Sequence, residues 1–235
     1  MKTLKILRNF LLCCPLVYGL ISCEDYLEVD LPSEQMSMEM VFEDQQTATS
    51  AVTTLYSKLR DDTLVTGFTG GLSVLMGLYA DEFNLYAMDN ESFLSFYNHS
   101  VVPANPNVNS FWDNSYHLIY LCNSALIGLE ESTGLSDDLK NQLTGEVLFI
   151  RSLVYFYLVN LFGDIPYITT IDPEVNQDVS RSSTTEVYQN IISDLLMSKS
   201  LLSDNYISGE KIRANKFVAS AFLARVYLYM EKWPE

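Results

Sequence analysis

Positively charged residues are scarce in this sequence of 235 residues, which holds 14 Lys and Arg against 30 Asp and Glu, a formal net charge of −16. Nucleic acids and anionic membrane surfaces bind to basic faces, so this balance argues against both as partners. Histidine is rarer still, with two residues, and neither lies at a zinc-ligand spacing from a cysteine or the other histidine. Phosphate-binding glycine loops, dinucleotide fingerprints and nucleophile elbows are also missing. We therefore expect no metal and no cofactor.

The most apolar run near the N-terminus is short. It covers residues 10–21, whereas a membrane-spanning helix needs about 20 apolar residues. Basic residues precede the run, which is typical of a secretory signal. It ends in Leu20-Ile21-Ser22-Cys23, the pattern of a bacterial lipobox. We predict a lipoprotein signal peptide over residues 1–22, with lipid attached to the Cys23 thiol; ordinary secretion is the alternative.

Cysteine is rare as well, with four residues in the chain. Cys13 and Cys14 would leave with the signal and Cys23 would be acylated, so Cys122 alone would remain and no internal disulfide could form. Cys122 lies in an apolar helical pattern and is predicted to be a small core residue. The expected attachment to a membrane is through the lipid only.

Apolar residues recur at helical spacing through most of the remaining chain. Helices are predicted from Asp44, over 72–79, from Trp112 to Gly134, from Ser136 to Gly163, behind a capping box at 183–186, and from about Ala214. Residues 23–43 are acidic and weakly patterned, which predicts an extended, lipid-anchored tether or docking segment. Residues 81–110 hold six asparagines and two prolines and are predicted to form a long loop. No convincing strand pattern occurs, so the fold class is all-α.

One internal similarity indicates how the helices are arranged. The tetrad VYFY at 154–157 recurs as VYLY at 226–229. Their separation is close to two tetratricopeptide repeats of about 34 residues each, with a loop insertion. Chance similarity between two aromatic amphipathic helices is the alternative. We predict tetratricopeptide-like stacked helix pairs with long irregular loops over residues 44–235.

A block at residues 149–167, FIRSLVYFYLVNLFGDIPY, is the most specific motif in the chain. It is similar to a signature that one family of surface proteins shares, "FLRA…YF.L…FGDIP". It departs from that signature by Ile150 in place of Leu and Ser152 in place of Ala. Further matching pieces are Tyr26-Leu27 behind the lipobox, Val41-Phe42, the acidic pair Asp81-Glu82 and the segment ARVYL at 224–228. Together these motifs resemble the SusD/RagB family of Bacteroidetes surface lipoproteins.

The resemblance implies a fold and a function. The implied fold is a SusD-like helical-repeat domain, and the implied protein is a nutrient-uptake lipoprotein of the outer membrane that faces the cell surface. It would bind an oligosaccharide as the lid and partner of a TonB-dependent, SusC-like transporter, without breaking bonds. Members of the family are longer than this chain, so the resemblance also implies that the sequence is the N-terminal part of such a protein.

Aromatic and amide side chains are concentrated between residues 79 and 120. Sugar binding uses aromatic faces for the C–H surfaces and amides or carboxylates for the hydroxyls. The candidate ligand-binding residues of the predicted loop are Tyr86, Asp89, Asn90, Phe96, Tyr97 and Asn98. The alternative is that the aromatics hold the loop against the helices while the asparagines serve turns.

Two other function classes are compatible with the composition. A helical-repeat scaffold of a surface complex would have no ligand site of its own. A glycoside hydrolase would need a pair of carboxylates, which the many Asp and Glu residues could supply. Asp81 and Glu82 are adjacent and do not face each other on a helix, so capping or solvated charge is expected there rather than a calcium or acid–base pair.

Overall fold

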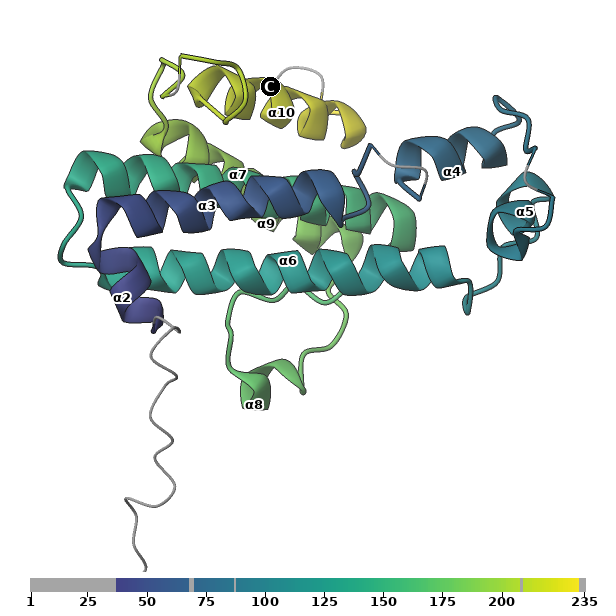
Figure 1. The fold of residues 1–235 in the computed structure, drawn as a ribbon, viewed down its shortest axis with the longest axis horizontal. Helices are drawn as coiled ribbons and strands as arrows, with labels where there is room; N and C mark the ends of the chain where they lie inside the picture. Colours follow the sequence, from purple (N-terminus) through teal and green to yellow (C-terminus); the bar gives the residue numbers. More distant parts are fainter. Residues whose placement is uncertain (1–36, 68–69, 87, 208, 233–235) are drawn as a thin grey trace, which may run out of the picture. The chain divides into compact units, whose positions relative to one another are not determined.

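The computed structural model describes residues 37–67, 70–86, 88–207 and 209–232, and the predicted signal peptide and Cys23 lie outside these residues. The described chain is helical (Figure 1), and its elements are α2 (Met38–Glu43), α3 (Gln45–Asp61), α4 (Leu72–Tyr79), α5 (Glu91–Tyr97), α6 (Pro106–Glu131), α7 (Asp137–Phe162), α8 (Pro173–Asn176), α9 (Thr184–Leu201) and α10 (Lys216–Tyr229). Within those ranges the one β pairing is an isolated bridge between Ile165 and Ser182. The all-α prediction is confirmed.

The long helices begin at side chains that cap them. The Asp44 carboxylate accepts hydrogen bonds from the amides of residues 46 and 47, at 2.9 and 3.1 Å, at the start of α3. Ser136 and Ser183 accept from the third residue of α7 and α9, at 3.4 and 3.3 Å. Each such cap is worth about 1 kcal/mol. Helix α7 ends at Gly163, whose φ of 71° is a conformation that favours glycine. These predicted boundaries are confirmed.

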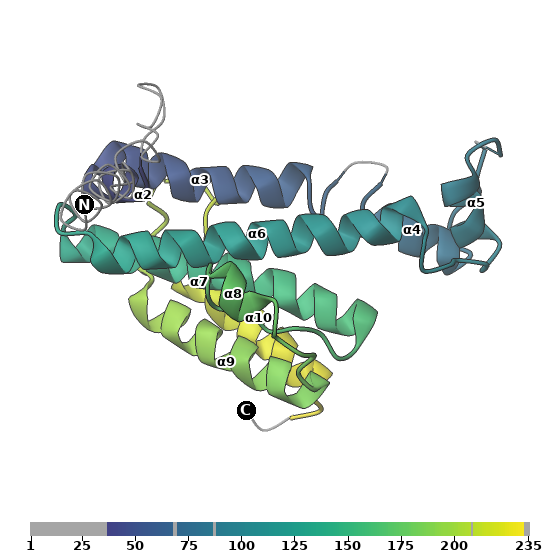
Figure 2. The same ribbon diagram turned by 90° about the horizontal axis from the view of Figure 1, so that it is seen from below.

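Helix α7 is the centre of the core. It packs against α6 and α3 and against α9, which in turn packs against α10, and Figure 2 shows α3, α6, α7 and α9 as successive layers. By length and apolar composition α7 could span a membrane, but 72% of its most apolar stretch is buried by the other helices. Ile150 and Tyr155 are fully buried. Its apolar character is that of a core helix.

The repeat pattern agrees with this packing. Helices α6 and α7 pack on each other as one pair, and α9 and α10 pack on each other as the next pair. The two pairs meet where α7 contacts α9. The VYFY tetrad lies in α7 and the VYLY tetrad in α10, so they occupy the second helix of each pair. The first valines of the two tetrads, Val154 and Val226, are both buried. Stacked helix pairs of tetratricopeptide type are therefore present.

The extended segment predicted for residues 23–43 was wrong for its last six residues, which form α2. Phe42 is buried against α6, where a Cβ atom at Gly128 would lie 2.2 Å from the Phe42 ring. The Glu43 carboxylate accepts hydrogen bonds from the amide and hydroxyl of Thr133, at 2.8 and 3.2 Å. Contacts with residues about 90 positions away thus hold a helix too short to be stable alone.

The long loop predicted for residues 81–110 was also wrong in part. Helix α5 lies inside it, and α6 begins at Pro106, ahead of the predicted Trp112. Two of the asparagines are helix caps: Asn90 accepts from the Phe93 amide at 3.3 Å, and Asn105 accepts from the Asn107 amide at 2.8 Å. Residues that favour turns thus start helices here.

Candidate functional site

Helices α4 and α5 pack on each other at one end of α6 (Figure 1) and, with the segments around them, form what we call the α4–α5 lobe, residues 70–105. The C-terminal ends of α4 and α5 meet at His99, whose Nε2 donates to the Tyr79 carbonyl at 2.7 Å and lies 3.4 Å from an Asp81 carboxylate oxygen. Asp81 and His99 have φ values of 59° and 54°, which cost a non-glycine residue about 1 kcal/mol each. This contact holds the segments that follow α4 and α5 together.

A surface hollow of about 530 Å³ lies on this lobe. Its lining comes from α4, the segment that follows it and α5: Val74, Leu78, Phe83, Asn84, Leu85, Tyr86, Asn90 and Phe93. Gly77 allows the Phe83 ring to lie directly on α4, because a Cβ atom there would be 2.4 Å from the ring. Tyr86 is 91% exposed and Phe83 is 49% exposed. Two aromatic side chains therefore present ring surface to solvent at the hollow.

The polar groups of the hollow are uncharged. The Asn90 oxygen accepts from the Phe93 amide at 3.3 Å and from the Ser92 hydroxyl at 2.8 Å. Within the described part of the chain, neither the Asn90 amide nitrogen nor the Asn84 side chain has a hydrogen-bond partner. Amide groups and the Tyr86 phenol can exchange hydrogen bonds with sugar hydroxyls. Aromatic faces beside neutral donors and acceptors are the composition that a carbohydrate surface needs.

The predicted ligand-binding residues lie in different environments. Tyr86 and Asn90 line the hollow, and Asp89, which directly precedes Asn90 in the sequence, is exposed. Phe96 is 2% exposed and belongs to the core, and Tyr97 is half-buried against the core.

Asn98 is exposed and caps the end of α5 through its backbone N–H, which donates to the Leu94 carbonyl at 2.9 Å. The structure therefore brings Tyr86 and Asn90 together at the hollow. Phe83, Phe93 and Asn84, which the candidate set omitted, join them there. The dense aromatic stretch pointed to the two phenylalanines, whereas no sequence signal pointed to Asn84.

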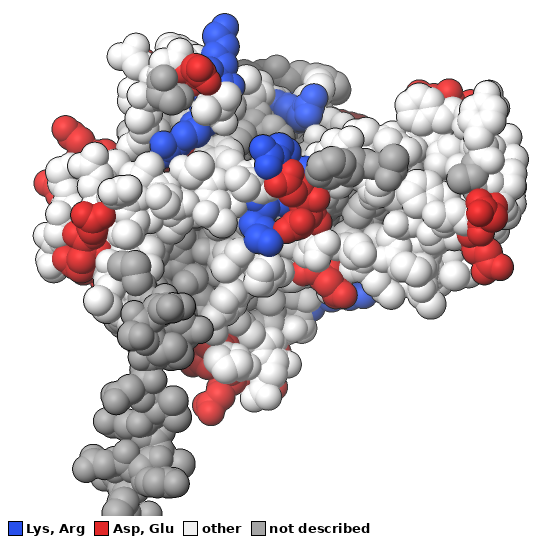
Figure 3. Space-filling model, in the orientation of Figure 1, with Lys and Arg blue, Asp and Glu red and all other residues white. Residues whose placement is uncertain are grey.

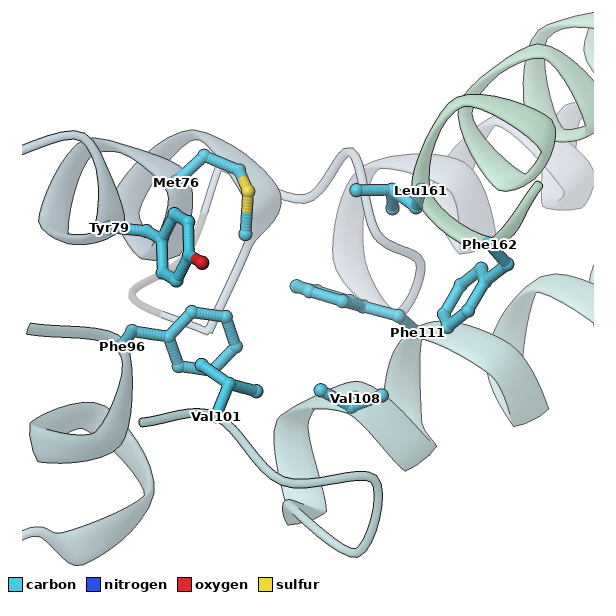
Figure 4. A pocket seen from close by; sticks show the side chains of 8 residues that line it. All are labelled: Met76, Tyr79, Phe96, Val101, Val108, Phe111, Leu161 and Phe162. Atoms are coloured by element: carbon cyan, nitrogen blue, oxygen red, sulfur yellow. The ribbon is translucent and has the colours of Figure 1, made fainter. Parts of the chain in front are cut away.

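A second cavity, of about 260 Å³, separates the lobe from the ends of α6 and α7 (Figure 4). It is lined by Met76, Tyr79, Phe96, Val101, Val108, Phe111, Leu161 and Phe162. The Tyr79 hydroxyl, turned toward the cavity in Figure 4, is the single polar side-chain group of that lining. Sugar hydroxyls would find few hydrogen-bond partners in this cavity, so the hollow is the better candidate for a sugar site.

A buried ion pair and its hydrogen-bond partners explain the most specific sequence block, residues 149–167. Arg151 donates from Nε and Nη2 to the two Asp194 oxygens, both at 2.9 Å, and from Nη1 to the Asn123 oxygen at 2.8 Å. The Tyr167 hydroxyl donates to the same carboxylate at 3.1 Å. Burial, and then the nearby Asp194 charge, raises the pKa of Tyr167. We call these four residues the anchor network.

The anchor network and its neighbours fix the segment that follows α7. The Tyr155 hydroxyl donates to the Ile168 carbonyl at 2.9 Å and accepts from the Ile168 amide at 2.8 Å. Tyr116 donates to the Pro166 carbonyl at 2.7 Å, and the Asp164 carboxylate accepts from the amide of residue 184 at 2.8 Å. The block at 149–167 therefore has a structural role, since its residues tie the end of α7 to α6 and α9.

Stacked helix pairs with the apolar α7 at their centre define a helical-repeat protein, and the aromatic-lined hollow on the α4–α5 lobe is its candidate binding site. A family model described as "Starch-binding associating with outer membrane" matches residues 25–228. The chain belongs to this SusD-like family.

Individual relatives agree. The SusD-like protein P25 of Formosa agariphila is 26% identical over 198 residues, which cover 80% of this chain and 37% of that protein. A SusD-like protein of Bacteroides fragilis has a crystal structure that matches with a TM-score of 0.70 and 26% identity, over 87% of this chain and 39% of that one. A structure described as a laminarin-binding SusD-like protein matches in fold, with a TM-score of 0.68 and 24% identity over 80% of this chain and 40% of that one. The chain thus spans about two fifths of the relatives it matches.

Proposed function

We propose that this protein is an oligosaccharide-binding lipoprotein of the outer membrane. In this proposal Cys23 carries the lipid and the protein faces the cell surface. There it takes up glycan as the partner of a TonB-dependent, SusC-like transporter, without cleaving the glycan.

The observation that carries the binding role is the hollow of the α4–α5 lobe. It combines the exposed rings of Phe83 and Tyr86 with the amides of Asn84 and Asn90. Relatives support the same role, since the described ligand of one SusD-like structure is laminarin and another related structure, from Bacteroides fluxus, is described as surface glycan-binding protein A. The family description supports outer-membrane association.

Replacing Tyr86 by alanine tests the binding role. Removing roughly 50 Å² of ring contact at about 25 cal/mol/Å² predicts a loss of about 1 kcal/mol, or roughly a fivefold higher Kd. Calorimetric titration with laminarin and a panel of other glycans measures this change, and circular dichroism checks the fold. Tyr120→Ala is the matched control, because Tyr120 is also exposed, at 47%, but lies on α6 outside the hollow. Equal affinities for the two variants would place glycan binding outside the hollow, and no binding of any glycan by the unaltered protein would favour the scaffold function.

The partner and the anchor need separate tests. A detergent-solubilised pull-down of the tagged full chain from its own bacterium is expected to recover a large outer-membrane β-barrel. Cys23→Ser is expected to release the protein from the membrane fraction, because the lipid would have no thiol to occupy. Recovery of the protein without a barrel would count against the transporter role and leave glycan binding to be judged from the titration.

A further inference from the structure

The α4–α5 lobe has an unusual charge pattern. No Lys or Arg occurs between Arg60 and Lys140, a stretch that includes the whole lobe. The lobe instead carries four carboxylates, Asp81, Glu82, Asp89 and Glu91, and all four side chains are exposed. Figure 3 shows the same pattern on one face of the molecule, where Asp and Glu but no Lys or Arg appear over the lobe.

Three of these carboxylates are sequence neighbours of residues that line the hollow. Glu82 directly precedes Phe83, and Asp89 and Glu91 stand on either side of Asn90. Among the described ion pairs, none involves Glu82, Asp89 or Glu91, so their charges are not neutralised by a neighbour.

The one residue of the lobe that can become positive is His99. Its Nε2 is already bonded to the Tyr79 carbonyl and lies beside the Asp81 carboxylate. Anionic ligands are commonly held by Arg or Lys, which supply charge-assisted hydrogen bonds. The hollow supplies instead the neutral amides of Asn84 and Asn90 and the Tyr86 phenol.

We infer that this site selects neutral oligosaccharides and rejects glycans that carry carboxylate or sulfate groups. The inference rests on the proposed function and deepens it by naming the substrate class. In water, one pair of like unit charges about 7 Å apart lowers an association constant roughly threefold. Two or three such pairs along an oligosaccharide would lower it by about tenfold or more. Salt weakens the effect, because the Debye length falls to about 8 Å at 0.15 M.

The test compares glycans that differ in charge alone. Laminari-, malto-, cello- and manno-hexaose are titrated into the full-length protein, each beside a derivative whose C6 hydroxyls are oxidised to carboxylates, at 20 and 150 mM NaCl. At least one neutral hexaose is expected to bind, with its oxidised form about tenfold weaker at 20 mM. The difference is expected to narrow at 150 mM, which a purely steric effect of the C6 oxidation would not produce.

A charge variant shows whether the lobe carboxylates are responsible. Glu82→Gln with Glu91→Gln is expected to strengthen binding of the oxidised form about fivefold at 20 mM and to leave the neutral form within twofold. Glu130→Gln with Glu131→Gln is the matched control, because both residues are exposed at the far end of α6, and it should change neither affinity.

Three outcomes would overturn the inference, and they are distinguishable. An oxidised or uronate oligosaccharide that binds as tightly as its neutral form refutes the selectivity but leaves glycan binding intact. Unchanged affinity of the oxidised form in the Glu82 and Glu91 variant removes the carboxylates as its cause. Binding of neither class refutes the proposed function, and the selectivity with it.

Discussion

Replacing Asp194 by asparagine should destabilise the protein more than any exposed charge change. Asp194 receives both ends of the Arg151 guanidinium fork, at 2.9 Å each, and the Tyr167 hydroxyl at 3.1 Å. The Arg151 and Asp194 side chains are only 8% and 13% exposed. Asparagine keeps the shape but removes the negative charge, so the buried guanidinium would lose its counter-ion and keep the Asn123 oxygen as its acceptor.

The size of the effect follows from this burial. Breaking a buried ion pair from one side costs about 3–5 kcal/mol, because the remaining charge stays desolvated. For a domain of this size, each kcal/mol lowers Tm by about 2–4 °C, so a decrease of roughly 6–20 °C is expected. A double variant, Arg151→Met with Asp194→Leu, should regain much of the loss because it leaves no buried charge.

Thermal and urea unfolding, followed by circular dichroism at 222 nm, measures the change. The matched control is Asp204→Asn, since Asp204 pairs with Lys216 at 3.1 Å but both side chains are well exposed, at 62% and 43%. That variant should cost less than about 1 kcal/mol. If Asp194→Asn were no more harmful than Asp204→Asn, the anchor network would not be a buried, charge-dependent element of the fold.

Three further predictions concern the core. Gly128→Ala should lower the free energy of unfolding in urea by about 1–3 kcal/mol, because the new Cβ would overlap the Phe42 ring and displace α2. Adding Phe42→Leu should restore part of this stability, since leucine is smaller. An unchanged free energy of unfolding in Gly128→Ala would contradict the contact. Burial raises the pKa of Cys122 from 9.0 to about 12, so iodoacetamide at pH 8 should label it only after unfolding. Burial also raises the pKa values of Tyr56 and Tyr167 above 10.0. As the pH rises, the unfolded chain therefore loses these protons before the folded protein does. The free energy of unfolding should fall by about 1.4 kcal/mol per phenol and pH unit above pH 10. A constant free energy of unfolding in this range would contradict the burial of the two phenols.

The sequence predicts the long helices well because their limits depend on local signals. Ser136 and Gly163 bound α7 through a side-chain cap and a left-handed backbone, which neighbouring residues suffice to specify. Helices α2 and α5 were missed for a physical reason. Both are short, and α2 depends on Gly128 far along the chain. The asparagine that starts α5 is equally typical of a turn.

The site could be predicted in part for the same reason. The aromatic and amide composition indicates the region that forms the hollow and names Tyr86 and Asn90, both of which line it. The composition does not tell a buried ring from an exposed one. Phe96 is buried in the core, whereas Tyr86 faces solvent from the segment that precedes α5. A helix of seven residues carries too little pattern to predict which of its faces is buried. Asn84 joins the site through chain geometry alone.

The long stretch without Lys or Arg also decides which proteases can probe the α4–α5 lobe. Trypsin cuts after these two residue types, so the whole region from residue 61 to Lys140 leaves a complete tryptic digest as one peptide, whether or not the lobe is folded. Chymotrypsin, which cuts after aromatic residues, finds Tyr86 almost fully accessible. A bound oligosaccharide that covers Tyr86 would therefore be visible as protection from chymotrypsin at that bond, while a tryptic digest of the same sample would register no change in the lobe.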